Sequence, residues 1–196
     1  RDLHLSIRRQ RQMCIRDRVS IMPHKIEAAR RVAEKAVEAL NLRSTNCHIE
    51  LMRTEGGWKV IELGPRIGGF RHEMYELSYG MDHSMNDILI RIPKKPILPK
   101  KTKGYTVVMQ FYARQKGKLV SLEGINKARK LESFSSITIK KKIGDMCDFA
   151  RNGDDPVFDI ILFNKDRSRV LADIRRLELA VAIKVQKPRT KQVVSR

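Results

Sequence analysis

The residues with the clearest chemical potential are two glutamates, Glu50 and Glu62, on either side of a glycine turn. Each lies in a short run of alternating apolar and polar residues, and the runs flank Glu55-Gly56-Gly57, which is the pattern of a β-hairpin. If all three turn residues form the loop, Thr54 faces Trp58 and Glu50 faces Glu62. Two opposed carboxylates on one sheet face repel each other unless a cation lies between them. This register predicts a divalent cation site, and Mg²⁺ fits best because it prefers carboxylate oxygen.

The length of the turn decides whether this site exists. A two-residue loop would shift the pairing by one position and place the two glutamates on opposite faces of the hairpin, where each carboxylate is simply solvated. The spacing alone leaves both registers open.

The segment that follows the second run favours the metal site. Residues 64–69 read GPRIGG, a stiff, glycine-rich exit from a strand, and Arg66 stands four residues beyond Glu62. Glycines such as Gly68 and Gly69 let a backbone approach a bound cofactor, and a planar guanidinium binds a carboxylate or phosphate through two parallel hydrogen bonds. Metal-binding carboxylates beside such an arginine are typical of phosphoryl transfer.

These residues resemble the last strands of the ATP-grasp catalytic domain. The resemblance rests on His48-Ile49-Glu50-Leu51, on the turn, and on residues 60–69, which read VIELGPRIGG. It is closest to the carboxylate-amine ligase branch, which includes the L-amino-acid ligases and the biotin carboxylase-like enzymes.

The resemblance implies a role for each of these positions. Glu50 and Glu62 would hold Mg²⁺, or Mn²⁺, against the phosphates of ATP, and Arg66 would contact the carboxylate substrate and its acyl phosphate. Many family members carry asparagine as a third metal ligand two residues after the second glutamate, where this chain has Gly64. The departure puts that one ligand in doubt.

The reaction that the resemblance implies has two steps. ATP phosphorylates a small-molecule carboxylate, and an amine then displaces the phosphate to form a C–N bond. Such a site also needs lysines and a glycine-rich loop on strands before this region. We therefore expect the chain to be the C-terminal fragment of a ligase, without ligase activity of its own.

Helical periodicity surrounds the expected hairpin. Residues 23–41 place apolar side chains at three- and four-residue steps, with Pro23 suited to the first turn. A second helix is predicted over residues 71–79 with Gly80 as its C-terminal residue, and a third from an N-cap at Asp82 to about residue 90. These helices and the hairpin predict an α+β fold, an antiparallel sheet with packed helices, over residues 19–92.

Three prolines and five lysines in residues 92–104 indicate a semi-extended connector, which we bound at 93–104. Residues 105–186 then predict a small β-rich domain. Its strands are expected at 105–113, 118–122, 136–142, 157–163 and 181–185, its helix at 166–179, and a turn at 152–156. Residues 1–18 have no lasting period and resemble translated adapter DNA, so we expect them to be non-native or disordered. Residues 187–196 form a basic tail.

The net charge of +19 suggests a second class of function, a basic module that binds nucleic acid. Such a module needs exposed aromatic side chains among its cations, and only Tyr105, Phe111 and Tyr112 stand near the lysines of the connector. Aromatic residues make up 6% of the chain, and these three fit a core strand. Nucleic acid is therefore not the favoured partner. A non-catalytic ATP-grasp remnant, suggested by Gly64, is a third hypothesis.

Composition sets the remaining bounds. Hydrophobic residues make up 41% of the 196 residues, which is enough for a core in one domain or two small ones. No apolar run approaches the length of a membrane span. Three cysteines without a CxxC spacing indicate neither a disulfide framework nor a zinc site, so a cytoplasmic location is expected.

Overall fold

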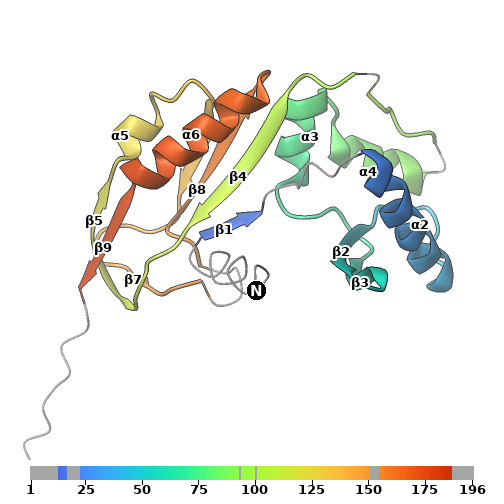
Figure 1. Cartoon of the computed structure of the whole chain (residues 1–196), viewed down its shortest axis with the longest axis horizontal. Coiled ribbons are helices and arrows are strands. Elements are labelled where there is room, and N and C mark those ends of the chain that lie inside the picture. Colours follow the sequence, from blue (N-terminus) through green and yellow to red (C-terminus); the bar gives the residue numbers. More distant parts are fainter. Residues whose placement is uncertain (1–12, 17–22, 93, 100, 151–154, 187–196) are drawn as a thin grey trace, which may run out of the picture. The chain divides into compact units, whose positions relative to one another are not determined.

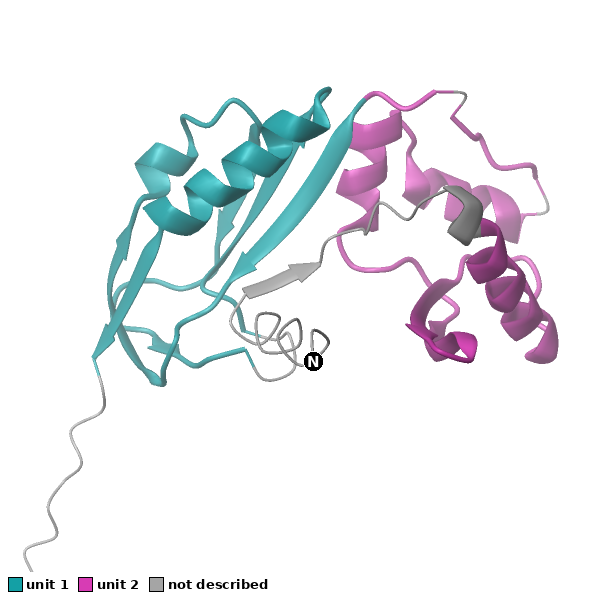
Figure 2. Ribbon diagram, viewed as in Figure 1, with its two compact units in different colours: residues 1–17, 104–196 teal, residues 18–103 magenta. Residues whose placement is uncertain are grey.

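The computed structural model describes residues 13–16, 23–92, 94–99, 101–150 and 155–186. The chain forms two compact units, residues 18–103 and residues 104–196 together with residues 1–17 (Figure 2). We call the first the hairpin unit and the second the sheet unit. The boundary at Lys103 and Gly104 falls at the end of the expected connector. The tail at 187–196, most of the turn at 152–156 and most of residues 1–18 lie outside the described residues.

The described residues of the hairpin unit form three helices and one two-stranded sheet (Figure 1). Helix α2 (Pro23–Ala39) packs against strands β2 (His48–Thr54) and β3 (Gly57–Gly64), which are antiparallel. Helices α3 (Arg71–Tyr79) and α4 (His83–Arg91) follow and contact each other. All three helices were expected from the sequence.

Local caps define the α3–α4 junction. Gly80 ends α3 with φ +67°, a conformation that glycine adopts without steric cost, and its N–H donates to the Glu76 carbonyl. The Asp82 carboxylate accepts a 2.8 Å hydrogen bond from the Met85 N–H at the start of α4. Asp82 is therefore the N-cap that its position in the sequence predicts.

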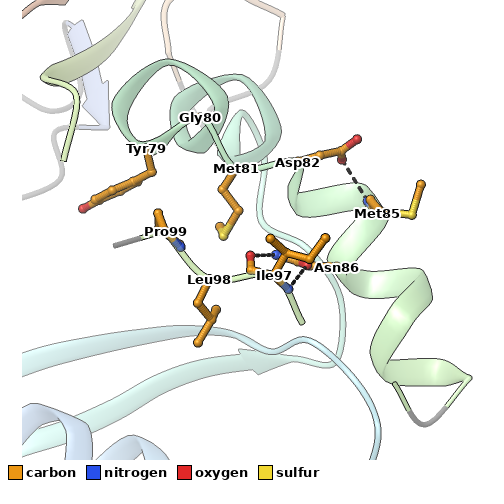
Figure 3. A pocket seen from close by; sticks show the side chains of 9 residues that line it. All are labelled: Tyr79, Gly80, Met81, Asp82, Met85, Asn86, Ile97, Leu98 and Pro99. Atoms are coloured by element: carbon orange, nitrogen blue, oxygen red, sulfur yellow. Dashed lines mark hydrogen bonds between the residues drawn. The ribbon is translucent and has the colours of Figure 1, made fainter. Parts of the chain in front are cut away.

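The connector is held against the hairpin unit. The Asn86 side chain of α4 donates to the Ile97 carbonyl at 2.8 Å and accepts from the Ile97 N–H at 2.7 Å. A pocket of about 240 Å³ lies beside this clamp, lined by Tyr79, Gly80, Met81, Asp82, Met85, Asn86, Ile97, Leu98 and Pro99 (Figure 3). The clamp satisfies both polar groups of the Ile97 backbone, although the Ile97 residue is 70% exposed.

The sheet unit contains two antiparallel sheets. The first has the order β1 (Met13–Arg16), β4 (Tyr105–Phe111), β8 (Phe158–Asn164) and β6 (Phe134–Ile139). The second has the order β7 (Met146–Cys147), β5 (Gly117–Glu123) and β9 (Ala182–Gln186). Helix α5 (Ile125–Ala128) is short, and α6 (Arg167–Ala180) contacts β4 and β8 (Figure 1).

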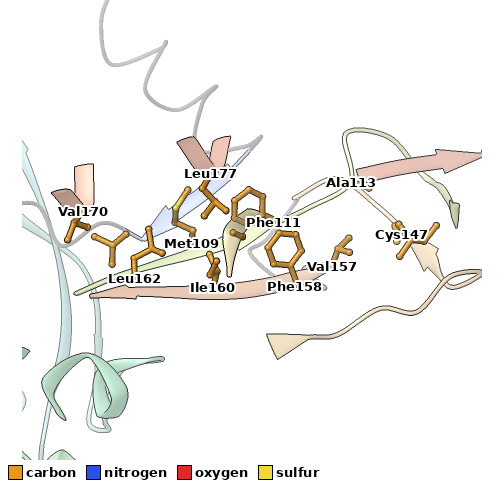
Figure 4. Packing of buried hydrophobic residues seen from close by; sticks show 13 residues of the cluster. Met109, Phe111, Ala113, Cys147, Val157, Phe158, Ile160, Leu162, Val170 and Leu177 are labelled. Carbon is orange, nitrogen blue, oxygen red and sulfur yellow. The ribbon is translucent and has the colours of Figure 1, made fainter. Parts of the chain in front are cut away.

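Strands β4 and β8 are buried on both faces and build the core. Met109, Phe158, Ile160 and Leu162 are fully buried, and Leu177 of α6 packs into the same cluster (Figure 4). The rings of Phe111 and Phe158 stack with centroids 4.4 Å apart. The α+β class predicted from the sequence is confirmed by this mixture of helices and antiparallel sheets.

Strand β1 differs from the expectation that residues 1–18 lie outside the fold. Met13–Arg16 pairs with β4, with Met13 opposite Phe111 and Arg16 opposite Val108. Backbone donors and acceptors at a sheet edge pair with any extended segment that reaches them, which side-chain periodicity does not reveal. The two-residue strand β7 and the helix α5 were also not expected, because both are too short to show a period.

One buried carboxylate joins helix α6 to the turn that precedes β6. Asp173 of α6 is fully buried; its Oδ2 accepts a 2.8 Å hydrogen bond from the Ser133 N–H, and its Oδ1 pairs with Arg176 at 2.8 Å. Burial raises the pKa of Asp173, but the hydrogen bonds from Ser133 and Arg176 outweigh it, so this pKa lies below its ordinary value.

No helix among the described residues is both long and apolar enough to cross a lipid bilayer.

Candidate functional site

The register of the β2–β3 hairpin brings the two predicted metal ligands together. Glu50 lies directly opposite Glu62 in the antiparallel ladder. Side chains of directly opposed residues project from the same face of a sheet, with their Cβ atoms about 5 Å apart. The two side chains are 45% and 58% exposed, so both carboxylates face solvent. Ile49, Leu51 and Leu63, which are partly buried, project from the other face.

The hairpin reaches this pairing through a β-bulge, which the sequence did not predict. Thr54 pairs with Gly57, and Leu51 pairs with Val60, so the tip follows the shorter of the two registers considered. A β-bulge between Glu50 and Leu51 then shifts the ladder by one residue, with Ile61 as the extra residue on β3. The bulge reverses the side-chain alternation and returns the two glutamates to one face.

Arg66 lies next to the second carboxylate. Its Nη2 is 3.8 Å from Oε1 of Glu62, and its Nη1 donates to the Ile67 carbonyl at 3.2 Å. The Arg66 N–H donates to the Gly64 carbonyl at 2.8 Å, a tight turn that directs the chain away from β3. Because the Arg66 and Glu62 side chains are both more than half exposed, this ion pair is weak, and each group remains available to a ligand.

His48 also belongs to this group, and sequence reasoning did not assign it a role. The His48 Nε2 lies 3.3 Å from Oε1 of Glu50, and the His48 side chain is only 15% exposed. Its ring packs against the backbone of Gly68. The alternation of β2 predicts that His48 lies on the same face as Glu50. The contact with Gly68 could not be predicted in this way, because it joins residues twenty positions apart.

The glycines of the exit segment differ in their surroundings. Gly68 is buried and Gly69 is exposed. At Gly64 a Cβ atom would lie 3.5 Å from the Arg66 Nε, an ordinary van der Waals distance, so the position has room for a side chain. Gly64 also pairs with His48 across the ladder, which puts such a side chain on the face that carries Glu50 and Glu62.

This arrangement is suited to a cation with an incomplete protein ligand set. Within the described part of the chain, no three His, Cys, Asp or Glu side chains form a group that could hold a metal ion. Two carboxylates are nevertheless a typical protein contribution to a Mg²⁺ site, because Mg²⁺ keeps several waters and is completed by substrate phosphates. The pair of Glu50 and Glu62 therefore fits Mg²⁺ bound together with a phosphate ligand.

Comparison by sequence and by structure gives different results. Neither a scan against models of protein families nor a search of curated proteins by sequence finds a match. The fold, in contrast, matches solved structures. Against the L-amino acid ligase from Bacillus licheniformis the TM-score is 0.73 at 17% identity, covering 87% of this chain and 43% of the ligase.

Two further structures give the same result. The phosphoribosylglycinamide synthetase from Anaerococcus prevotii matches with a TM-score of 0.68 at 18% identity, covering 86% of this chain and 44% of the synthetase. The N5-carboxyaminoimidazole ribonucleotide synthetase from Thermotoga maritima matches with a TM-score of 0.62 at 20% identity, covering 85% of this chain and 44% of that enzyme.

These likenesses establish the fold. The chain has the fold of part of each of these ligase and synthetase structures, as its resemblance to the ATP-grasp domain implied, and it spans less than half the length of each enzyme that it matches.

Proposed function

We propose that this chain carries the metal-binding side of the active site of an ATP-dependent ligase that joins a small-molecule carboxylate to an amine. The observation that carries the proposal is the direct pairing of Glu50 with Glu62, with Arg66 beside Glu62, on a fold shared with such ligases. A bulged hairpin that restores the pairing of two like charges has a structural cost without a ligand, and a bound cation supplies the compensation.

Each residue has a distinct task in the proposed reaction. Glu50 and Glu62 would hold Mg²⁺, for which Mn²⁺ can substitute, and the chemistry supplied by the bound ion would be neutralisation of charge on the ATP phosphates. Arg66, on the rim of the hairpin, binds the substrate carboxylate and orients it for phosphorylation. The same guanidinium then stabilises the acyl phosphate, which the amine attacks.

The exit segment completes this part of the site. Gly69 is exposed and lets the backbone come close to the nucleotide, where a side chain would hold it at a distance. Gly68 contributes its backbone beside it, since the side on which it lacks a side chain is filled by the His48 ring. A reducing cytoplasm is part of the same proposal, and the three cysteines without a CxxC spacing support it.

The nucleic-acid alternative is less well supported. Phe111 and Tyr112 are only 5% and 4% exposed, so neither ring can stack on a base. Tyr105, at 45% exposure, is the one of the three that a nucleotide could reach.

Mn²⁺ binding tests the proposal. The dissociation constant of the full 196-residue chain for Mn²⁺ would be measured by electron paramagnetic resonance, with and without ATP. We expect Glu50→Gln and Glu62→Gln each to weaken binding by about tenfold or more, since each removes one charged ligand. Glu55→Gln, at the exposed tip of the same hairpin, is the matched control. Equal affinities in all four proteins would overturn the proposal.

A further inference from the structure

The ring of His48 is held between two parts of the candidate site. On one side its Nε2 contacts the Glu50 carboxylate at 3.3 Å. On the other side the ring lies so close to Gly68 that a Cβ atom there would be 2.6 Å from Nδ1 and 3.0 Å from Cγ and Cε1. Real Cβ contacts do not occur at the first of these distances, so any side chain at position 68 would displace the ring.

The requirement for glycine at this position is one of space. The backbone of Gly68 does not have the positive φ that favours glycine, whereas Gly57 and Gly80 do. Alanine at Gly68 would therefore not meet the strain of a positive φ, and the three atoms nearest to its Cβ would all belong to the His48 ring. A Gly68→Ala variant therefore tests the contact with the His48 ring without the strain of a positive φ.

The chemistry of the pair fixes the tautomer of the ring. An ionised carboxylate only accepts hydrogen bonds, so the bond to Glu50 requires a proton on Nε2. In the neutral ring Nδ1 then carries no proton and faces the Gly68 backbone. The donor ring is only 15% exposed, so its bond favours one orientation of the Glu50 carboxylate.

We propose that His48 is a positioning residue that couples the exit segment to the metal site. Its ring transmits the position of the Gly68 backbone to the Glu50 carboxylate. The Arg66 guanidinium donates to the carbonyl of Ile67, the residue before Gly68, so a carboxylate substrate that binds this guanidinium acts on the chain next to the backbone against which the ring rests. Substrate binding and the geometry of the metal ligands are thereby linked through one side chain. The inference rests on the proposed function for the identity of the ion.

A cycle of variants in the metal-free protein tests the coupling directly. The ¹⁵N chemical shifts of the His48 ring would be measured in the full chain and in Glu50→Gln and Gly68→Ala, with Gly56→Ala as the control. At Gly56 a Cβ atom would lie 3.9 Å from the nearest atom, the Thr54 Oγ1, so alanine is accommodated there. We expect the Nε2–H tautomer in the wild type and altered ring shifts in the first two variants only. The opposite tautomer, or shifts that do not respond to Gly68→Ala, would overturn the inference.

Mn²⁺ affinity then shows whether the coupling reaches the metal. Residues that orient a metal ligand change affinity about 10- to 100-fold when mutated. We expect His48→Ala and Gly68→Ala each to weaken Mn²⁺ binding at least about tenfold, and the double variant to bind as His48→Ala does, since the clash requires the ring. His48→Gln, which retains a side-chain N–H, is expected to restore part of the affinity. Thermal unfolding of each variant checks that it is folded.

The outcomes distinguish this inference from the proposed function. If Gly68→Ala weakens Mn²⁺ binding equally with and without the His48 ring, the coupling is wrong and the metal site stands. If Mn²⁺ does not bind while the ring shifts still respond to Glu50→Gln and Gly68→Ala, the metal assignment is wrong and the coupling stands.

Discussion

Glu50 lies directly opposite Glu62, although the turn between them has the register that should place them on opposite faces. One extra residue, Ile61, corrects the alternation midway along the hairpin. The strand register at the tip of the hairpin therefore differs by one residue from the register at its base. This relationship yields the first prediction.

Deletion of Ile61 is expected to keep Glu50 opposite Glu62. Removing the extra residue closes the ladder into a regular one and leaves both flanking pairs, Leu51 with Val60 and Glu50 with Glu62, in register. Nuclear Overhauser contacts between the Hα atoms of cross-strand residues report the pairing. The Mn²⁺ affinity of the deletion variant should remain within about threefold of the wild type. A ladder in which Glu50 pairs with Leu63 instead would contradict the assignment of the bulge.

Gly64→Asn is expected to strengthen Mn²⁺ binding. The position has space for a side chain and faces the same side of the hairpin as the two glutamates, so an amide oxygen there can serve as a third ligand. We expect a gain of about three- to tenfold in affinity. Gly64→Ala adds the Cβ without the oxygen and should bind as the wild type does. Equal affinity of both variants would mean that position 64 does not reach the ion.

Asp173→Asn is expected to destabilise the sheet unit at neutral pH, by about 1–3 kcal/mol, because the buried carboxylate accepts bonds from Ser133 and Arg176. The pKa of Asp173 is lowered in the folded state, so its stabilisation is present above the unfolded pKa, about 3.9, and is lost as the pH falls through the folded value. Urea unfolding at pH 7 and pH 3 would measure both proteins.

The difference between wild type and Asp173→Asn should therefore shrink at pH 3. A constant difference at both pH values would show that the carboxylate charge makes no contribution, and that the loss arises from packing alone.

The isolated 196-residue chain is expected to release no ADP from ATP, with or without carboxylic acids and amines. It spans 43% of the ligase from Bacillus licheniformis, and phosphoryl transfer needs positive groups around the transferred phosphate in addition to the metal. Coupled spectrophotometric detection of ADP provides the measurement. Turnover that depends on Glu62 would contradict this expectation and would show that the chain contains a complete site.

Local sequence signals predicted the longer helices α2, α3, α4 and α6, but not the short α5. They predicted the pairing of Glu50 with Glu62 but not the bulge that produces it. Gly80 and Asp82 mark the end of α3 and the start of α4 because caps act through neighbouring residues. The pairing of Glu50 with Glu62 was expected from a three-residue loop, and the structure achieves it with a bulge. Turn residues determine the register near the tip, but a bulge depends on the twist and packing of the whole hairpin.

The role of His48 could not be predicted from the sequence, for a second physical reason. Its place in the strand predicts the face on which it lies, but its packing depends on Gly68, a residue from a segment with no regular structure. Contacts of this kind arise when the chain folds back on itself, and no periodicity encodes them. The pairing of β1 with β4 was missed for the same reason.

The two hydrogen bonds between Asn86 and Ile97 also affect how readily a protease cleaves this chain. The connector carries an exposed lysine, Lys94, after which trypsin can cut, whereas Lys95 is followed by proline and is not a tryptic site. A protease binds its substrate as an extended strand, and the two bonds from Asn86 hold the Ile97 backbone, three residues beyond Lys94, in place on the hairpin unit. Limited trypsin digestion should therefore spare the connector in the wild type and cut it rapidly in Asn86→Ala, so the clamp protects the link between the two units from proteolysis.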